Sequence, residues 1–240
     1  MKNIIIIGSE GLIGTALIKG LSKYYNILAI DKRKKSKIAK NFLSCDLSTM
    51  SGIKILKNYL MLSKKRYFAV VNLAYPAVRG KKKNFFTIDP FEISEEISEH
   101  FGVYFSTMQT LVNYFIYNKI KGNIINFTSI YGEFIPRFEL YDRTSMNMPI
   151  QYLITKNNII NTSKYVAKIN LKKNIRVNCI SPGGIIDNQN KNFVKKYSRF
   201  TQTNSLLKAK NLIGLVEFML SKKSLNITGQ NLIIDDGFTL

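Results

Sequence analysis

Seven short runs of apolar and β-branched residues recur along the chain, and segments with helical spacing lie between most of them. Strands that are buried on both faces form continuous apolar runs of this kind, as in a parallel sheet covered by helices. The pattern therefore predicts an α/β fold, a doubly wound parallel sheet of about seven strands with helices on both faces. The expected strands are residues 3–7, 26–30, 41–45, 67–71, 123–127, 174–180 and 231–235.

The length and composition are those of a globular domain. With 240 residues, the chain is long enough to bury a large core without disulfides or metals, so we expect a single domain over residues 1–240. The two cysteines, Cys45 and Cys179, lie in apolar runs, and one histidine, His100, cannot build a metal centre alone. We therefore expect buried thiols, no metal site and a cytoplasmic location.

The net charge is strongly positive, at +21, with 36 Lys and Arg against 15 Asp and Glu. Basic runs such as DKRKKSK (31–37) raise the question of nucleic-acid binding, but no recognised nucleic-acid-binding motif accompanies them. We interpret the charge as a solvated surface that steers anionic ligands, and expect no nucleic-acid partner. No apolar stretch reaches the roughly 18 residues that cross a membrane, so we also expect no membrane partner.

A glycine-rich turn, GSEGLIG (8–14), follows the first expected strand and opens a helical pattern. Glycines in this context allow a tight turn and let backbone amides approach a pyrophosphate at the positive end of a helix. The residues expected to bind a dinucleotide here are Gly8, Gly11, Leu12, Ile13 and Gly14.

Asp31 closes the second expected strand, 17 residues beyond Gly14. A carboxylate at this position accepts hydrogen bonds from the adenosine ribose hydroxyls and repels a 2′-phosphate. The sequence therefore predicts NAD rather than NADP, although Lys32 and Arg33 follow directly and weaken the preference.

Tyr152 stands four residues before Lys156, so on a helix the ammonium lies on the same face as the phenol and favours its deprotonated form. Tyr117 and Lys121 have the same spacing, so the pair alone does not identify a site. Ser129 directly follows the fifth expected strand, at the end of the sheet where parallel sheets bind ligands.

Taken together, these features resemble the short-chain dehydrogenase/reductase family over essentially the whole chain, and imply its Rossmann-type fold. The matching features are the glycine turn, Asp31, Asp46, Asn72, Ala74, Ser129, Tyr152, Lys156, SPGG (181–184) and TGQNLIIDDG (228–237). Further cofactor contacts implied by the resemblance are Asp46, Leu47, Asn72, Ala74, Tyr152, Lys156, Pro182, Gly183 and Ile185.

The resemblance implies hydride transfer between nicotinamide C4 and an alcohol or carbonyl carbon. In this family Tyr152 would exchange the hydroxyl proton, Lys156 would lower its pKa and hold the nicotinamide ribose, and Ser129 would hydrogen-bond the reacting oxygen. Tyr152 differs from Tyr117 in following a strand-end serine and beginning the helix expected to line the cofactor.

Three features depart from the usual family pattern, and the third is the long separation of Ser129 and Tyr152. The GxxGxxG spacing is closer to an extended, sugar-nucleotide-modifying branch, whereas the length and the TGQ motif fit the shorter branch, to which we assign the chain. Aligning HFGVYF on the fourth catalytic motif places Glu99 where the family usually has Asn, with His100 beside it. Glu99 is therefore our candidate for the proton relay.

The stretch GEFIPRFELYDRTSMNMP (132–149) lengthens the connection between Ser129 and Tyr152. It is similar to a branch associated with flagellin glycan modification and with sugars for surface polysaccharides. Its residues Arg137, Tyr141 and Arg143 suit a polyhydroxylated, anionic substrate, because guanidinium groups bind phosphate or carboxylate in fork geometry.

The sequence thus predicts an NAD-dependent oxidoreductase acting on a sugar-like or nucleotide-sugar alcohol. The alternatives are an epimerase or dehydratase that uses NAD transiently, and an NAD-binding protein with impaired catalysis. By resemblance, helices 91–118 and 150–170 would pair across subunits of a homodimer or homotetramer. Residues 183–207 are expected to form a long loop or lid.

Overall fold

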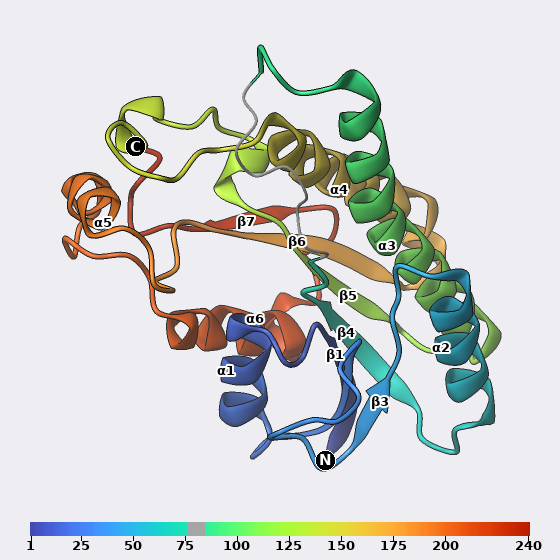
Figure 1. Ribbon diagram of the computed structural model, residues 1–240. Coiled ribbons are helices and arrows are strands. Elements are labelled where there is room, and N and C mark those ends of the chain that lie inside the picture. The colour runs from blue at the N-terminus through green and yellow to red at the C-terminus, as the bar shows by residue number, and fades with distance from the viewer. Residues whose placement is uncertain (76–84) are drawn as a thin grey trace.

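The sheet has seven strands in the order β3-β2-β1-β4-β5-β6-β7, and every neighbouring pair is parallel (Figure 1). The computed structural model describes residues 1–75 and 85–240. The strands are β1 (Lys2–Ile7), β2 (Tyr25–Asp31), β3 (Phe42–Ser44), β4 (Tyr67–Asn72), β5 (Asn123–Phe127), β6 (Arg176–Pro182) and β7 (Asn231–Ile234). Each of the predicted strands is confirmed, with ends that shift by at most two residues.

Helices cover both faces of the sheet, as the sequence predicts (Figure 1). The helices are α1 (Leu12–Leu21), α2 (Met50–Leu62), α3 (Pro90–Tyr117), α4 (Ile150–Ile169), α5 (Lys191–Tyr197) and α6 (Ile213–Leu220). Short 3₁₀ turns are η1 (Ile130–Gly132), η2 (Phe138–Leu140), η3 (Leu171–Lys173), η4 (Ser198–Phe200), η5 (Ala209–Leu212) and η6 (Lys222–Ser224). In the described ranges, no helix combines the length and apolar character required to cross a membrane.

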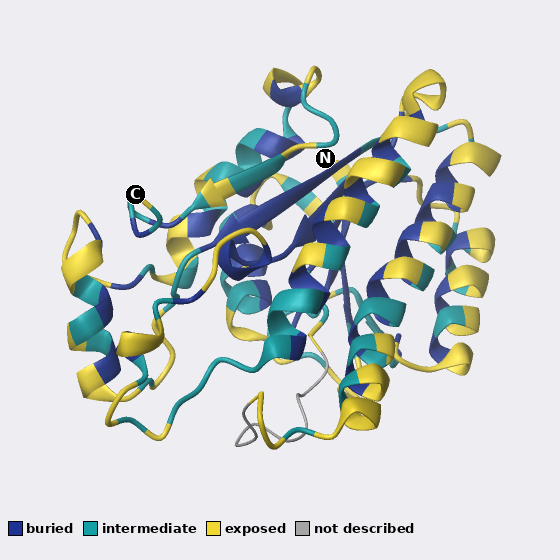
Figure 2. Cartoon of the chain, turned by 90° about the horizontal axis from the view of Figure 1, so that it is seen from above, coloured by how far each residue is buried: buried dark blue, intermediate teal, exposed yellow. Residues whose placement is uncertain are grey.

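Alternation along β1 divides the core into two layers. Ile4 and Ile6 pack with α1 and α6, whereas Ile5 and Ile7 pack with α2, α3 and α4. Successive side chains of a strand point to opposite faces, so a strand with helices on both sides must be apolar throughout. The central strands are accordingly buried, while the outer helix surfaces are exposed (Figure 2).

A third apolar cluster joins segments that are distant in sequence. It consists of Ile130, Tyr131, Leu140, Phe193, Tyr197, Leu206 and Phe238. The Tyr197 ring stacks on the Phe238 ring with centroids 4.0 Å apart, and Gly184 N donates to the Tyr197 hydroxyl at 2.6 Å. The expectation of a loop over residues 183–207 was therefore incomplete, because α5 forms there and packs through its aromatic side chains.

Gly52, near the start of α2, positions the turn that carries Asp46. A Cβ on Gly52 would lie 1.8 Å from the Asp46 carbonyl oxygen, so a side chain there forces backbone atoms apart. We expect Gly52→Ala to lower the free energy of unfolding by about 2 kcal/mol or more, measured by urea denaturation. The matched control is Gly214→Ala in α6, where no atom lies within 4 Å of the added Cβ. That change should stabilise the protein by about 0.5 kcal/mol, and equal effects of the two changes would contradict the close approach.

Candidate active site

The glycine turn after β1 is closed by direct backbone contact. Gly8 has φ +73°, and a Cβ on Gly14 would lie 2.3 Å from the Gly8 carbonyl oxygen. Gly11 is the N-cap of α1 and offers no side chain to the first amides of the helix, which include those of Leu12 and Ile13. These amides suit an anionic group at the helix N-terminus, so the turn fits the pyrophosphate of a dinucleotide.

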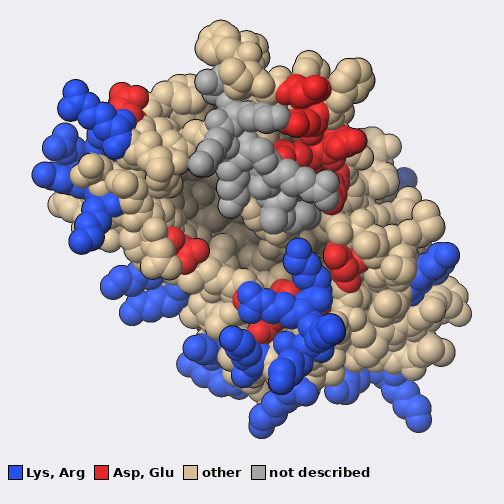
Figure 3. Space-filling model, viewed as in Figure 1, with Lys and Arg blue, Asp and Glu red and all other residues tan. Residues whose placement is uncertain are grey.

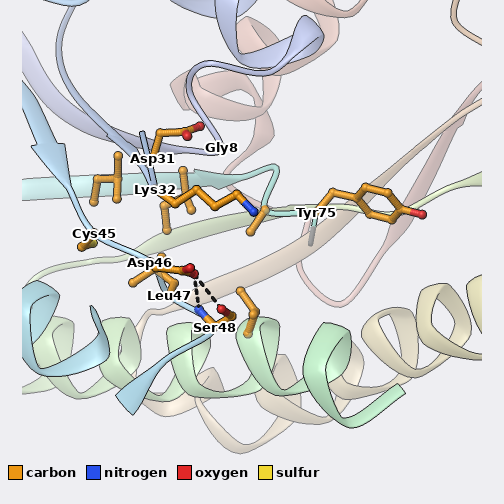
Figure 4. Close-up of a pocket in the computed structure, with 12 residues that line it drawn as sticks. Gly8, Asp31, Lys32, Cys45, Asp46, Leu47, Ser48 and Tyr75 are labelled. Carbon is orange, nitrogen blue, oxygen red and sulfur yellow. Dashed lines mark hydrogen bonds between the residues drawn. The ribbon is translucent and has the colours of Figure 1, made fainter. Parts of the chain in front are cut away.

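A cavity of about 100 Å³ lies beside this turn, at the carboxyl ends of β1, β2 and β4 (Figure 4). The predicted cofactor residues on its wall are Gly8, Asp31, Asp46, Leu47 and Ala74. Lys32, Ser48 and Tyr75 line it as well, although the sequence reasoning assigned no cofactor contact to them.

Backbone amides hold the Asp31 carboxylate at the cavity. Its Oδ2 accepts from Glu10 N at 3.0 Å, and its Oδ1 accepts from Arg33 N at 3.1 Å. The Glu10 carboxylate in turn accepts from Ser36 Oγ at 2.5 Å and Lys37 N at 3.2 Å. Two carboxylates are thus fixed on this side of the site, next to the lysine-rich loop that follows β2.

Asp46 and Asn72 are also held by local hydrogen bonds. Asp46 Oδ1 accepts from Ser48 Oγ at 2.7 Å and Ser48 N at 3.0 Å, and the bond from the Ser48 hydroxyl is the main cause that lowers the pKa of Asp46. Asn72 Oδ1 accepts from Ala74 N at 3.1 Å. Asn72 is fully buried, and within the described part of the chain its Nδ2 has no hydrogen-bond partner, so a donor remains for a bound group.

The other predicted cofactor residues follow β6. Pro182 is the last residue of the strand, Gly183 N donates to Ile234 O at 2.9 Å, and Ile185 forms an isolated bridge with Leu207. The two cysteines are free and buried, as expected. Burial raises the pKa of Cys45 to about 11, so this thiol beside the cavity stays protonated.

Ser129, Tyr152 and Lys156 converge at the carboxyl end of β5. Ser129 lies two residues after the end of β5 and accepts from Tyr131 N at 3.2 Å, and Tyr152 lies in the first turn of α4. Lys156, one turn later, is only 5% exposed; its Nζ lies 5.5 Å from the centre of the Tyr152 ring. The structure thus brings together the three side chains that the sequence selected.

The ionisation of Tyr152 and Lys156 is governed by burial. Burial raises the pKa of Tyr152, and a hydrogen bond from Ser129 lowers it. Burial lowers the pKa of Lys156 to about 8. Both shifts penalise the charged form in a low-dielectric site. The Lys156 ammonium also lies 5.2 Å from the Tyr75 ring centre and 5.7 Å from the Tyr104 ring centre, where the ring faces partly stabilise its charge.

Glu99, the sequence candidate for the relay, is not brought to this centre. It is partly buried on α3 and is absent from the residues that line a second cavity beside Tyr152 and Lys156. Glu96 and His100 of the same helix do line it, together with Gln151 and Tyr75, which sequence reasoning did not select. Glu96 and His100 are four residues apart and share one helix face, and Glu99 lies at the edge of that face.

The expected substrate residues lie on the third apolar cluster and near it. The Tyr141 hydroxyl donates to the Tyr131 hydroxyl at 3.4 Å. The Arg137 guanidinium lies 4.4 Å from the Phe200 ring centre and donates to the Leu240 oxygen at 3.4 Å. Arg143 is exposed on a turn with φ +57°. The structure therefore ties Arg137 to the C-terminal residues and leaves Arg143 at the surface.

The surface around the site is divided by charge. Figure 3 shows a hollow with acidic side chains gathered over α3 on one side and many Lys and Arg on the other. The acidic residues of α3 are Glu92, Glu95, Glu96 and Glu99. The basic side adjoins the loop after β2, so it favours the approach of an anionic ligand.

Comparison with known proteins assigns the chain to a family that agrees with the geometry of the site. A family described as Enoyl-(Acyl carrier protein) reductase matches residues 26–239. The crystal structure of a short chain dehydrogenase from Leptospira borgpetersenii serovar Hardjo-bovis, with bound NAD+, superimposes with a TM-score of 0.89 at 31% identity. The match covers 100% of this chain and 93% of that one.

Curated relatives extend the comparison. The Post-translational flagellin modification protein A of Campylobacter coli is 30% identical over 100% of this chain and 98% of its own length. The Glucose 1-dehydrogenase 2 of Bacillus subtilis is 29% identical over 54% of this chain and 48% of its own length. The full-length matches and the geometry of the site agree, and the chain belongs to the short-chain dehydrogenase/reductase family of oxidoreductases.

Proposed function

We propose that the protein transfers hydride between NAD(H) and a hydroxyl or carbonyl carbon of a sugar-like or nucleotide-sugar substrate, in the synthesis of flagellin-glycan or surface-glycan precursors. The observation that carries the proposal is the convergence of Ser129, Tyr152 and Lys156 beside the cavity of the glycine turn. Bound NAD would supply the hydride acceptor or donor at nicotinamide C4.

Three side chains carry out the proton transfer that accompanies hydride transfer. Tyr152 takes the hydroxyl proton when an alcohol is oxidised and returns it when a carbonyl is reduced. Ser129 donates to the reacting oxygen and lowers the pKa of Tyr152, opposing the effect of burial. Lys156, with a pKa lowered to about 8, exchanges protons readily near neutral pH.

Asp31 supports NAD over NADP. Its carboxylate is fixed by the amides of Glu10 and Arg33, so a 2′-phosphate placed there meets a negative charge that cannot easily turn away. Lys32 lines the same cavity, and its positive charge would attract a 2′-phosphate. It therefore limits the preference for NAD over NADP.

Hydroxyl groups and aromatic rings near Tyr152 support a sugar-like substrate. Tyr131 and Tyr141 hydrogen-bond through their hydroxyls, and burial and, to a lesser extent, the nearby Tyr152 raise the pKa of both. Rings with polar tips suit a ligand that carries many hydroxyls. Among the relatives, one modifies flagellin and another is a glucose dehydrogenase.

Changing Tyr152 to Phe tests proton transfer. We expect Tyr152→Phe to retain the fold and NAD binding but to lower turnover at least about 10²-fold, because the phenol is the proton carrier. Steady-state kinetics and NAD titration measure the two quantities. Tyr117→Phe, at a tyrosine 79% exposed on α3, is the control. If the control were the more damaging change, the assignment of Tyr152 would fail.

Changing Asp31 to Ser tests cofactor choice. The unaltered protein should bind NAD more tightly than NADP. Asp31→Ser should reduce this difference in affinity, because it removes the repulsion of the 2′-phosphate. Calorimetric titration of both cofactors measures the difference, with Asp187→Ser at an exposed site as the control. Equal affinities of the unaltered protein for the two cofactors would contradict the proposed preference.

A substrate panel tests the sugar assignment. Oxidation of sugars, sugar phosphates and nucleotide sugars is compared with that of a hydroxysteroid and other apolar alcohols, with NADH formation as the signal. Arg137→Ala and Arg143→Ala should raise the KM of the preferred sugar and leave NAD affinity unchanged. For Arg137→Ala we expect the KM of the sugar to rise about tenfold, because one charged hydrogen bond is lost. Preference for the apolar alcohols would overturn the substrate class, and turnover without accumulation of NADH would indicate an epimerase or dehydratase.

A further inference from the structure

A second, small cavity lies behind the catalytic pair, between α3 and α4. Tyr152 and Lys156 form one side of it, and the side chains opposite are Glu96, His100, Gln151 and Thr155. Its volume is about 10 Å³, which is room for a single water molecule. The cavity is therefore too small for part of a substrate but large enough for a bridging water.

Glu96 places a buried carboxylate at this cavity, with few hydrogen-bond donors to offset the cost of its burial. It is 7% exposed and accepts from Gln151 Nε2 at 2.6 Å, its one hydrogen bond among the described residues. A carboxylate that is withdrawn from water is costly unless several donors satisfy it. Gln151 is 3% exposed, and in the same part of the chain its Oε1 has no hydrogen-bond partner. Two acceptors thus meet at a space that a proton-carrying water fits.

The ionisable groups around Glu96 link it to the catalytic pair. From other elements the groups are Tyr75, Tyr152 and Lys156, and from α3 itself they are Glu92, Glu95, Glu99 and His100. The Tyr75 ring meets the His100 ring edge-on at 5.2 Å and the Tyr152 ring at 5.9 Å. Glu92 and Glu95, within one helical turn of the buried Glu96, are exposed to solvent.

We propose that Glu96 is the group through which the proton taken up by Tyr152 reaches solvent, with Gln151 holding its carboxylate at the cavity. This inference rests on the proposed function, because each alcohol oxidised gives one hydride to NAD and one proton to Tyr152. That proton passes through Lys156 and a water in the cavity to the Glu96 carboxylate, and then to bulk water; carbonyl reduction draws a proton along the reverse path. Glu96 touches neither substrate nor cofactor, so it acts through Lys156 as a positioning and relay residue.

The kinetic test compares Glu96→Gln with Glu95→Gln, the exposed neighbour on the same helix. D-glucose oxidation by NAD is followed against pH in H₂O and in D₂O, with and without formate as a small external base. For Glu96→Gln we expect kcat to fall about tenfold or more, a solvent isotope effect larger than that of the unaltered protein, and partial recovery with formate. The rising limb of the rate should also move to lower pH, because losing a negative charge lowers the pKa of neighbouring groups. Glu95→Gln should match the unaltered protein in all four respects.

A second measurement needs no substrate and separates this inference from the proposed function. Calorimetric titration with NAD in two buffers of different ionisation enthalpy counts the protons released on binding at each pH. Glu96→Gln should move this release to lower pH, whereas Glu96→Asp, which keeps the charge, should retain the unaltered count and lose part of kcat. An unchanged proton count, or an unchanged isotope effect without recovery by formate, would overturn the role of Glu96. If no member of the sugar panel reacts, the substrate class fails while the proton count still decides the role of Glu96.

Discussion

The register of β1 between β2 and β4 is the constraint on which the whole site depends. Ile7 lies opposite Ile30 on one side and Asn72 on the other, and Gly8 N donates to Ile30 O at 2.9 Å. The glycine turn is therefore held between the segment that carries Asp31 and the segment that begins with Asn72. A slip of one residue would turn the side chains of β1 to the opposite layers and separate the turn from both partners.

The fold was predictable where the deciding interactions are local or periodic. Buried parallel strands must be apolar on both faces, so the runs could be found without knowing their neighbours. The region 183–207 was not predictable in the same way, because α5 is short and depends on long-range packing. Phe193 and Tyr197 are buried in a cluster of residues distant in sequence, and Phe238, from the end of the chain, stacks on Tyr197. No pattern within the segment reveals that contact.

The same distinction separates the site residues that were selected from those that were missed. Ser129 lies just after a buried strand, and Tyr152 and Lys156 have helical spacing, so local sequence patterns place all three. The cavity behind them forms where α3 packs on α4, and it depends on the reach of Glu96 toward Gln151. The family alignment pointed to Glu99, one position from His100. Glu96 and His100, which line the cavity, are four residues apart, and this helical spacing was the signal in the sequence for the pair.

Charge separation makes the two ends of the site suitable for different ions. The chain carries a net charge of +21, yet acidic side chains gather over α3 on one side of the hollow, opposite the Lys and Arg (Figure 3). The basic side adjoins the dinucleotide cavity, where phosphates must bind. Lys156 lies between the two regions; its burial, at 5% exposure, lowers its pKa to about 8, so its proton is weakly held and has a carboxylate-rich helix nearby. An oxidoreductase of this kind binds a cofactor with a dianionic pyrophosphate and releases a proton in each oxidation. The distribution of charge therefore attracts the anion at one end and draws the proton away at the other, which a uniformly basic surface would not do.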